Sequence, residues 1–173
     1  MNGFLLFVPF LLIRFGLLSA LNKRAVKRAA HFAPMRKDER WVYWMYQISN
    51  VALFVCLFFL KIEVDISWLF YTGAVVYLLG LVYCTASIVN FAAPSKEGLN
   101  TSGLYRISRN PMYVSYFMIF AGCALLTQSL ILGGIVIVFI LSSHGIILAE
   151  ERWCIERFGE AYRKYMERVR RYL

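Results

Sequence analysis

Two polar clusters in this sequence combine residue types that can bind a charged ligand. The first is RISRNP at 106–111, which stands directly before an apolar stretch. Proline is favoured at the first position of a helix and asparagine just before it, so the cluster predicts a helix start. A helix N-terminus presents free N–H groups and partial positive charge, and Arg106 and Arg109 add two guanidinium groups. The combination is suited to a carboxylate or a phosphate, although arginines placed here can instead contact lipid headgroups.

The second cluster is the acidic pair Glu150 and Glu151, which follows an apolar stretch that ends at Ala149. The two carboxylates can hold a cationic or hydrogen-donating group of a ligand, or they can form salt bridges with neighbouring arginines. His144 lies seven residues before Glu151, two helical turns away and so on about the same face. An ionisable side chain inside an apolar helix is a candidate functional group, either as a base or as a hydrogen-bond partner between helices.

The elements that position these clusters are apolar helices. The chain of 173 residues is 60% hydrophobic and 17% aromatic, which exceeds ordinary globular usage and indicates a membrane protein. A spanning helix needs about 20 mostly apolar residues, and five segments approach or meet that length. We therefore predict an all-α integral membrane protein with one domain over residues 1–173, a tight C-terminal helical hairpin and a cytoplasmic amphipathic C-terminal helix. The predicted spans are 4–21, 41–60, 68–93, 111–128 and 130–149.

The distribution of basic residues predicts the topology. Net charge is +9, but the basic residues lie mainly between the first two spans, between the third and fourth, and after the fifth, which argues against a nucleic-acid-binding face. With five spans these regions share one side, so the positive-inside rule places the N-terminus outside and the C-terminus in the cytoplasm. Both polar clusters then lie on the cytoplasmic face of the same hairpin, where they match a zwitterionic ligand. The cysteine spacing gives no reason to expect a metal.

The two clusters also carry a family resemblance. GLYRISRNPMY at 103–113, followed by EERWCIERFGEAYRKY at 150–165, resembles the isoprenylcysteine carboxyl methyltransferase and phospholipid methyltransferase superfamily, integral membrane enzymes that use S-adenosylmethionine. The resemblance implies a cofactor-binding region over residues 98–165. The cofactor-binding residues that it and the charge argument predict are Gly103, Tyr105, Arg106, Arg109, Asn110, Pro111, Tyr113, Glu150 and Glu151. The catalytic candidates are Arg109, His144 and Glu151.

The acceptor is left open by the sequence. Asn110 resembles the phospholipid enzymes, since the prenylcysteine enzymes usually carry histidine there, and Ile146 stands where the prenylcysteine enzymes carry an arginine. A phospholipid amine, a prenylcysteine carboxylate and a small lipophilic thiol all fit a substrate that enters from membrane lipid, and the oligomeric state is not readable. Two alternatives are a sterol-type membrane reductase that uses NADPH and a non-enzymatic lipid-binding protein.

Overall fold

The computed structural model describes residues 1–29, 32–93 and 98–173, apart from the side chain of Arg24. This part of the chain is helical, with isolated bridges in place of strands, so the all-α prediction is confirmed. The helices are η1 (Gly3–Leu6), α1 (Phe7–Leu11), η2 (Leu12–Leu17), α2 (Leu18–Leu21), α3 (Lys23–Ala29), η3 (Lys37–Glu39), α4 (Arg40–Phe59), α5 (Trp68–Ala92), η4 (Gly103–Arg106), α6 (Pro111–Leu126), α7 (Leu130–Phe158) and α8 (Glu160–Arg168).

Four helical stretches are long and apolar enough to cross a bilayer, which indicates an integral membrane protein. They are Gly3–Leu21, Lys37–Phe59, α5 and α7. The fifth predicted span coincides with α6, a helix of 16 residues. Its length of about 24 Å is less than the roughly 30 Å of a hydrocarbon core, so the count of five spans stays a prediction.

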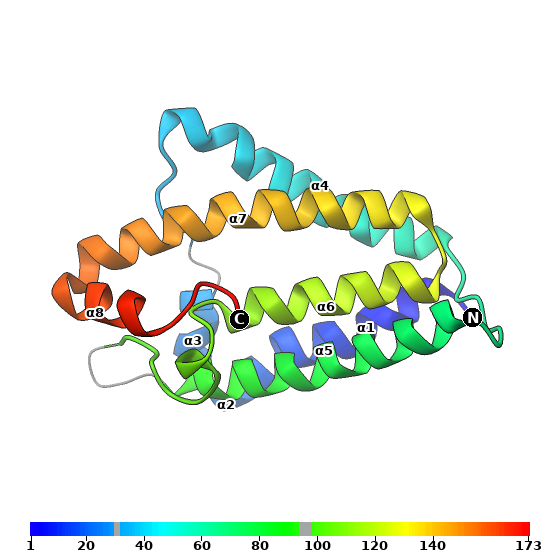
Figure 1. The fold of residues 1–173 in the computed structure, drawn as a ribbon, viewed down its shortest axis with the longest axis horizontal. Coiled ribbons are helices and arrows are strands. Elements are labelled where there is room, and N and C mark those ends of the chain that lie inside the picture. Colours follow the sequence, from blue (N-terminus) through cyan, green and yellow to red (C-terminus); the bar gives the residue numbers. More distant parts are fainter. Residues whose placement is uncertain (30–31, 94–97) are drawn as a thin grey trace.

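Helices α5 and α6 run antiparallel and pack closely, because small residues line their contact (Figure 1). A Cβ atom added to Gly73 or Gly80 of α5, or to Gly122 of α6, would come within 3.0 Å of the facing helix. Small residues also stand at Gly133 and Gly134 of α7, on the other side of α6 in the chain. They do not form a comparable close contact, since a Cβ at either position meets nothing within 4 Å.

The N-terminal helices close the bundle with aromatic side chains. Phe7 stacks on Phe54 of α4 with ring centroids 4.1 Å apart, and Phe10 meets Phe120 of α6 at 5.4 Å. Phe120 in turn contacts Phe139 of α7 at 5.0 Å. Between these contacts and α3 the helix passes through the π-helical turn η2, which carries Arg14 toward the end of the bundle where α3 lies.

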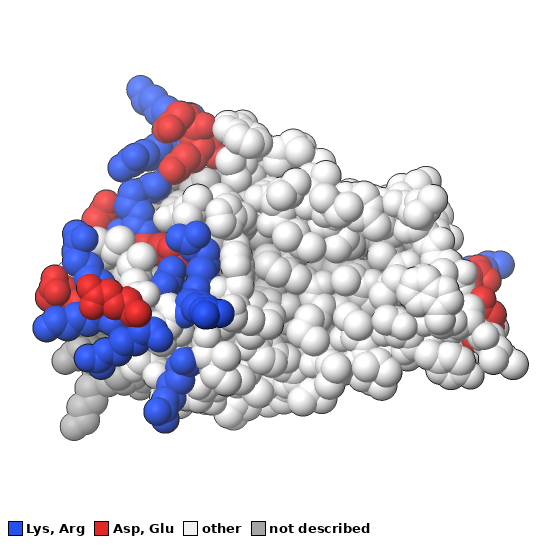
Figure 2. Space-filling view, in the orientation of Figure 1, with Lys and Arg blue, Asp and Glu red and all other residues white. Residues whose placement is uncertain are grey.

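Charged residues are concentrated at one end of the bundle. Figure 2 shows most Lys, Arg, Asp and Glu side chains around α3 and α8, a small group at the opposite end, and an uncharged middle. The N-terminus lies at the sparsely charged end, where the Gly3 amide donates to the Leu60 carbonyl at 2.8 Å. Large apolar side chains are exposed along the middle, as a lipid-facing surface requires.

The C-terminal region differs from the predicted single amphipathic helix. Helix α7 continues well beyond the expected end of the fifth span to Phe158, and Gly159, with φ of 55°, separates it from the short α8. Tyr162 and Tyr165 of α8 are buried, and the Tyr165 hydroxyl donates to the Tyr105 carbonyl at 2.6 Å. Helix α8 therefore packs its aromatic face on the rest of the protein.

Candidate functional site

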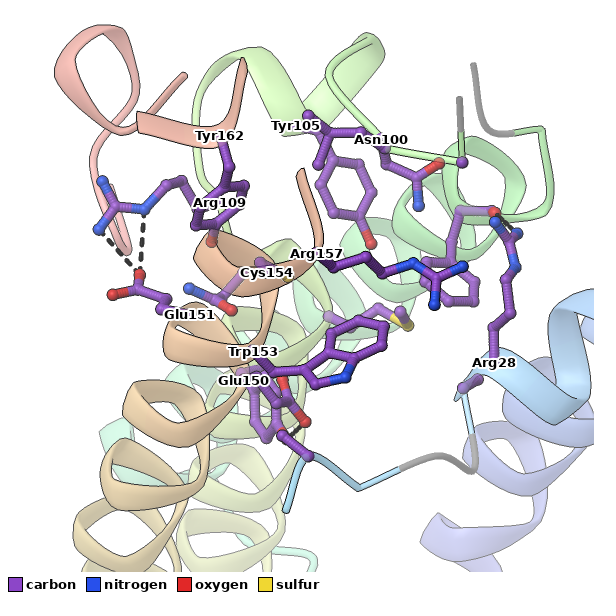
Figure 3. A pocket seen from close by; sticks show the side chains of 18 of the residues that line it. Arg28, Asn100, Tyr105, Arg109, Glu150, Glu151, Trp153, Cys154, Arg157 and Tyr162 are labelled. Carbon is purple, nitrogen blue, oxygen red and sulfur yellow. Dashed lines mark hydrogen bonds and ion pairs between the residues drawn. The ribbon is translucent and has the colours of Figure 1, made fainter. Parts of the chain in front are cut away.

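A cavity of about 540 Å³ opens at the charged end of the bundle (Figure 3). Helices from both halves of the chain line it. The lining residues are Arg14, Lys27, Arg28, Ala29, Phe32 and Ala33 from the N-terminal part, Tyr46 and Phe91 from α4 and α5, Gly98, Leu99, Asn100, Tyr105, Arg109 and Asn110 from the loop before α6, Met112, Tyr113 and Tyr116 from α6, and Glu150, Glu151, Trp153, Cys154, Arg157, Phe158, Tyr162 and Tyr165 from α7 and α8.

Of the two carboxylates that line the cavity, Glu150 is the one free to bind a ligand. It extends from α7 into the cavity and accepts a hydrogen bond from the Tyr113 hydroxyl at 3.0 Å. The described part of the chain gives it no arginine or lysine within ion-pair distance. Glu150 and Tyr113 were both predicted from the motifs, and the structure brings them together.

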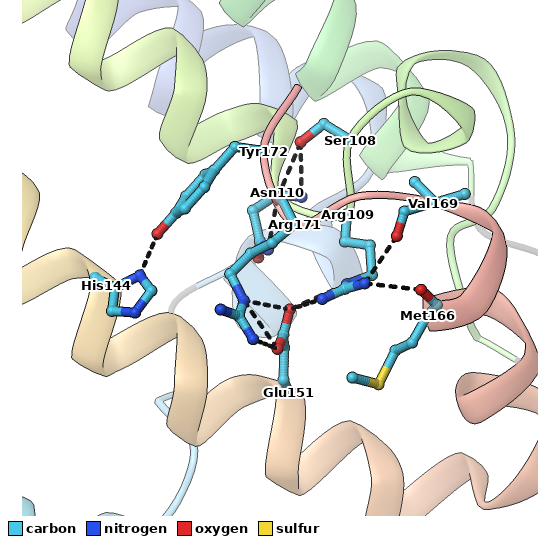
Figure 4. Close-up of polar contacts among 9 residues, drawn as sticks. All are labelled: Ser108, Arg109, Asn110, His144, Glu151, Met166, Val169, Arg171 and Tyr172. Carbon is cyan, nitrogen blue, oxygen red and sulfur yellow. Dashed lines mark hydrogen bonds and ion pairs between the residues drawn. The ribbon is translucent and has the colours of Figure 1, made fainter.

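Glu151, by contrast, is saturated by two arginines (Figure 4). Its Oε1 accepts from Arg109 Nε and Nη2 at 3.0 and 2.8 Å, and its Oε2 accepts from Arg171 Nε and Nη2 at 3.1 and 2.9 Å. The remaining Arg109 donor, Nη1, bonds the carbonyls of Met166 and Val169. Glu151 is only 5% exposed, and hydrogen bonding to it raises the pKa of Arg171. The two motif residues predicted to bind the cofactor therefore bind each other and the C-terminal segment.

The C-terminal segment lies across the start of α6 and forms several hydrogen bonds there. The Arg109 amide donates to the Arg170 carbonyl at 2.9 Å, and Asn110 Nδ2 and Ser108 Oγ donate to the Arg171 carbonyl at 3.1 and 3.3 Å. Asn110 occupies the N-cap position and Pro111 the first position of the helix, as predicted. The Asn110 side chain makes no capping bond, however, because its amide is turned to the C-terminal segment.

His144 lies beside this segment and outside the lining of the cavity. Its Nδ1 is 2.7 Å from the Tyr172 hydroxyl (Figure 4). Of the two roles that the sequence left open for His144, this contact favours the structural one, and a catalytic role stays a prediction.

Three other predicted residues, Gly103, Arg106 and Pro111, do not line the cavity. Gly103 has φ of 60° and lies so close to the Asn90 amide that a Cβ atom would collide with it. Asn90 Oδ1 accepts from the Leu104 amide at 2.8 Å, which fixes the loop to α5. Pro111 is buried and Arg106 is exposed. Tyr105 does line the cavity, and burial raises the pKa of its hydroxyl.

Several cavity residues lie in or near the predicted cofactor-binding region 98–165 but were not among the predicted site residues. Arg157 places its guanidinium 5.1 Å from the Trp153 ring centroid, and Arg28 faces them from α3. Asn100 Oδ1 is buried against the cavity and has no hydrogen-bond partner in the described part of the chain. The motif at 150–165 contains Trp153 and Arg157, and Arg14 could have been found because it interrupts an apolar run.

The comparison with known families covers the C-terminal half of this site. Residues 83–161 match the phospholipid methyltransferase family. No curated protein matches the chain. The matched region contains the loop before α6, α6 itself and the acidic pair, so the superfamily resemblance of the motifs is confirmed. The match supports methyl transfer to a lipid-type acceptor and does not favour the reductase or the non-enzymatic alternative.

Proposed function

We propose that the protein transfers a methyl group from S-adenosylmethionine to a lipophilic acceptor at the membrane surface. The observation that carries this proposal is a single cavity in the family-matched region that combines the carboxylate of Glu150, the guanidinium of Arg157 and the indole of Trp153. S-adenosylmethionine carries an ammonium and a sulfonium, a carboxylate, ribose hydroxyls and a flat adenine, and these residue types complement such groups.

The cavity fits the cofactor in size and in chemistry. Its volume of about 540 Å³ lies within the range of roughly 300–1,000 Å³ that is usual for small-molecule sites. Among the described residues the buried Oδ1 of Asn100 has no hydrogen-bond donor, as expected of an acceptor that bonds a ligand hydroxyl or amino group. We assign Glu150 to the cationic amino group or the ribose, Arg157 to the carboxylate, Asn100 to a hydroxyl or amino group and Trp153 to the adenine.

In this proposal Arg109 and Glu151 act by holding the site together. Their ion pair fixes the start of α6 to α7 and the C-terminal segment, which keeps Tyr113 and Glu150 in the cavity wall. When bound, S-adenosylmethionine supplies an electrophilic methyl group, whose bond to sulfur breaks as the acceptor heteroatom forms its bond to carbon. The protein then has to align the two reactants and exclude water, tasks for which a rigid cavity wall is suited.

The charge distribution supports cofactor entry from the cytoplasm and acceptor entry from the bilayer. Because most charged residues surround the cavity end, the positive-inside rule assigns that end to the cytoplasm and the N-terminus to the outside. The exposed apolar surface of the helices ends near the cavity, so a lipid can present its polar end there while its chains stay in the membrane.

Incubation of the purified protein in lipid nanodiscs with tritiated-methyl S-adenosylmethionine tests the proposal. We expect label in the extracted lipid fraction, and we expect Glu150→Gln to abolish it while Glu160→Gln, an exposed carboxylate outside the cavity, leaves it unchanged. Absence of label from lipids, prenylcysteine analogues and lipophilic thiols alike would overturn the proposal.

A further inference from the structure

The cavity wall contributed by the N-terminal helices is strongly cationic, and it lies outside the region that matches the family. Arg14 comes from η2, Lys27 and Arg28 from α3, and all three precede residue 83, where the match begins. In Figure 3, Arg28 faces the residues of α7 from α3. No motif of the family region accounts for these side chains.

Arg14 is the most unusual of them because it interrupts an apolar helix. An arginine in such a helix is costly unless it meets a partner or a polar cavity. Its Nη2 donates to the Ala29 carbonyl at 3.0 Å, and its guanidinium lies 5.9 Å from the Tyr116 ring centroid. It occupies the π-helical turn η2, a distortion that is frequent at functional sites. One hydrogen bond uses only one of the five N–H donors of the guanidinium.

Arg28 likewise has guanidinium N–H donors without a hydrogen bond among the described residues. Its Nη2 donates to the Phe91 carbonyl at 2.8 Å and its guanidinium lies 4.9 Å from the Phe91 ring. Within the described residues neither Arg28 nor Arg14 has a carboxylate within ion-pair distance. Burial lowers the pKa of Arg28, so a nearby anion would stabilise its charged form.

The charges around the cavity do not balance. Among its described lining residues, Arg14, Lys27, Arg28 and Arg157 are cations without an ion pair, whereas Glu150 is the one carboxylate not already paired, since Glu151 binds two arginines. S-adenosylmethionine has a net charge of about +1 at neutral pH, from two cationic groups and one carboxylate. Glu150 interacts electrostatically with Arg14, but one carboxylate does not offset four cations. The cofactor alone therefore leaves a surplus of positive charge at the N-terminal wall.

We propose that Arg14 and Arg28 form a subsite for an anionic group on the methyl acceptor, either a phosphodiester or a carboxylate. This inference rests on the proposed methyl transfer, and it narrows the acceptor to amphiphiles that carry negative charge near the methylated atom. Guanidinium groups bind both kinds of oxyanion through paired hydrogen bonds. The family-matched wall holds the cofactor, and the N-terminal wall selects the acceptor.

Calorimetric binding of three short amphiphiles to the detergent-solubilised protein tests the subsite without requiring turnover. The probes are dihexanoylphosphatidylethanolamine, a zwitterion that carries an anionic phosphodiester, N-decanoylglycine, which carries a carboxylate, and uncharged N-decanoylethanolamine. We expect at least one of the two probes with an anionic group to bind about tenfold or more tightly than the uncharged probe, as a charge-assisted hydrogen bond predicts. The probe that binds more tightly shows whether the acceptor's anionic group is a phosphodiester or a carboxylate.

Substitutions then locate the preference. Arg14→Gln and Arg28→Gln should each remove most of the preference. Arg14→Lys, which keeps the charge but not the paired hydrogen bonds, should retain part of it, and Arg163→Gln, at an exposed arginine of α8 outside the cavity, should retain all of it. Arg28→Gln and Arg14→Lys keep the test decisive if Arg14→Gln fails to fold. An equal affinity for all three probes, or a preference that survives both glutamine variants, would overturn the subsite.

S-adenosylmethionine binding, measured on the same samples, separates this inference from the function on which it rests. Unchanged cofactor affinity in Arg14→Gln and Arg28→Gln is the expected result. Loss of cofactor affinity with an unaltered probe preference would assign these arginines to the cofactor and refute the subsite. Failure of the unsubstituted protein to bind S-adenosylmethionine would refute the methyltransferase proposal. The probe affinities would still show whether Arg14 and Arg28 bind an anionic group.

Discussion

Replacing Glu151 by alanine separates two roles for the acidic pair, because Glu151 is held by two ion pairs, whereas Glu150 has none among the described residues and is left for a ligand. The side chains of Glu151 and Arg109 are 6% and 8% exposed, and Glu151 joins Arg109 to Arg171 of the C-terminal segment. Glu151→Ala removes the shared acceptor and leaves the buried guanidinium of Arg109 without a counter-charge. Removing one partner of a buried ion pair typically costs about 3–5 kcal/mol of unfolding free energy.

That cost corresponds to a large change in thermal stability. For a chain of this size 1 kcal/mol shifts the melting temperature by about 2–4 °C, so we expect a decrease of about 6–20 °C. The four tryptophans allow unfolding in detergent to be followed by intrinsic fluorescence. The C-terminal segment should also become sensitive to limited proteolysis, because Glu151 holds Arg171 and positions Arg109 for its bonds to Met166 and Val169.

The Glu39–Arg152 pair provides a matched control. It has a similar N–O distance, 2.7 Å, but its side chains are 25% and 24% exposed. Exposed ion pairs contribute about 0–1 kcal/mol, so Glu39→Ala should lower the melting temperature by at most about 4 °C. In the double variant Arg109→Met/Glu151→Leu, stability should recover relative to Glu151→Ala, since no buried charge remains unpaired and the Arg171 side chain, which is 32% exposed, can be hydrated. A Glu151→Ala protein that melts like the unsubstituted protein would refute the structural role and return Glu151 to the cofactor site.

Three further predictions follow from local geometry. Gly103→Ala should destabilise the protein by about 1–3 kcal/mol, because the residue has positive φ and no space for a Cβ atom. Gly133→Ala, where a Cβ meets nothing within 4 Å, should be neutral or stabilising, and thermal melts of both variants check this. Tyr172→Phe should cost about 0.5–1.5 kcal/mol and leave methyl transfer intact, and a matching retention of activity in His144→Gln would exclude a catalytic role for that histidine. Hydrogen bonds lower the pKa of Asp65, so its contribution to stability should be present above the ordinary aspartate pKa of about 3.9 and be lost as the pH falls through the lowered value. Asp65→Asn should remove this contribution to the pH dependence of stability, which an acid titration of unfolding measures.

The sequence predicted the helices better than their contacts. Apolar length located the helices, and the pair Asn110 and Pro111 located the start of α6 correctly. The sequence did not predict that glycines would bring α5 and α6 together. Small residues indicate that a helix packs closely against another, but they do not indicate against which helix. The end of α7 was misplaced because Glu150 interrupts the apolar run without interrupting the helix, which continues to Gly159.

The site was predicted in part. The motifs identified Tyr113 and Glu150, which meet in the cavity, and also Arg109 and Glu151, which instead pair with each other. The sequence shows an arginine and a carboxylate in two motifs, but it does not show whether they bind a ligand or each other. Their partner Arg171 lies in the basic tail, which was predicted to form an amphipathic helix and not to contact the site, so only the folded chain distinguishes the two cases.

Titration of S-adenosylmethionine into the purified protein by calorimetry tests the central claim most directly. The account predicts binding of S-adenosylmethionine and none of NADPH, with at least a tenfold loss of affinity, about 1.4 kcal/mol, in Glu150→Gln and in Arg157→Gln and no loss in Arg163→Gln. The same affinity in the unsubstituted protein, Glu150→Gln and Arg157→Gln, or no binding in any of them, would contradict the assignment of this cavity to the cofactor.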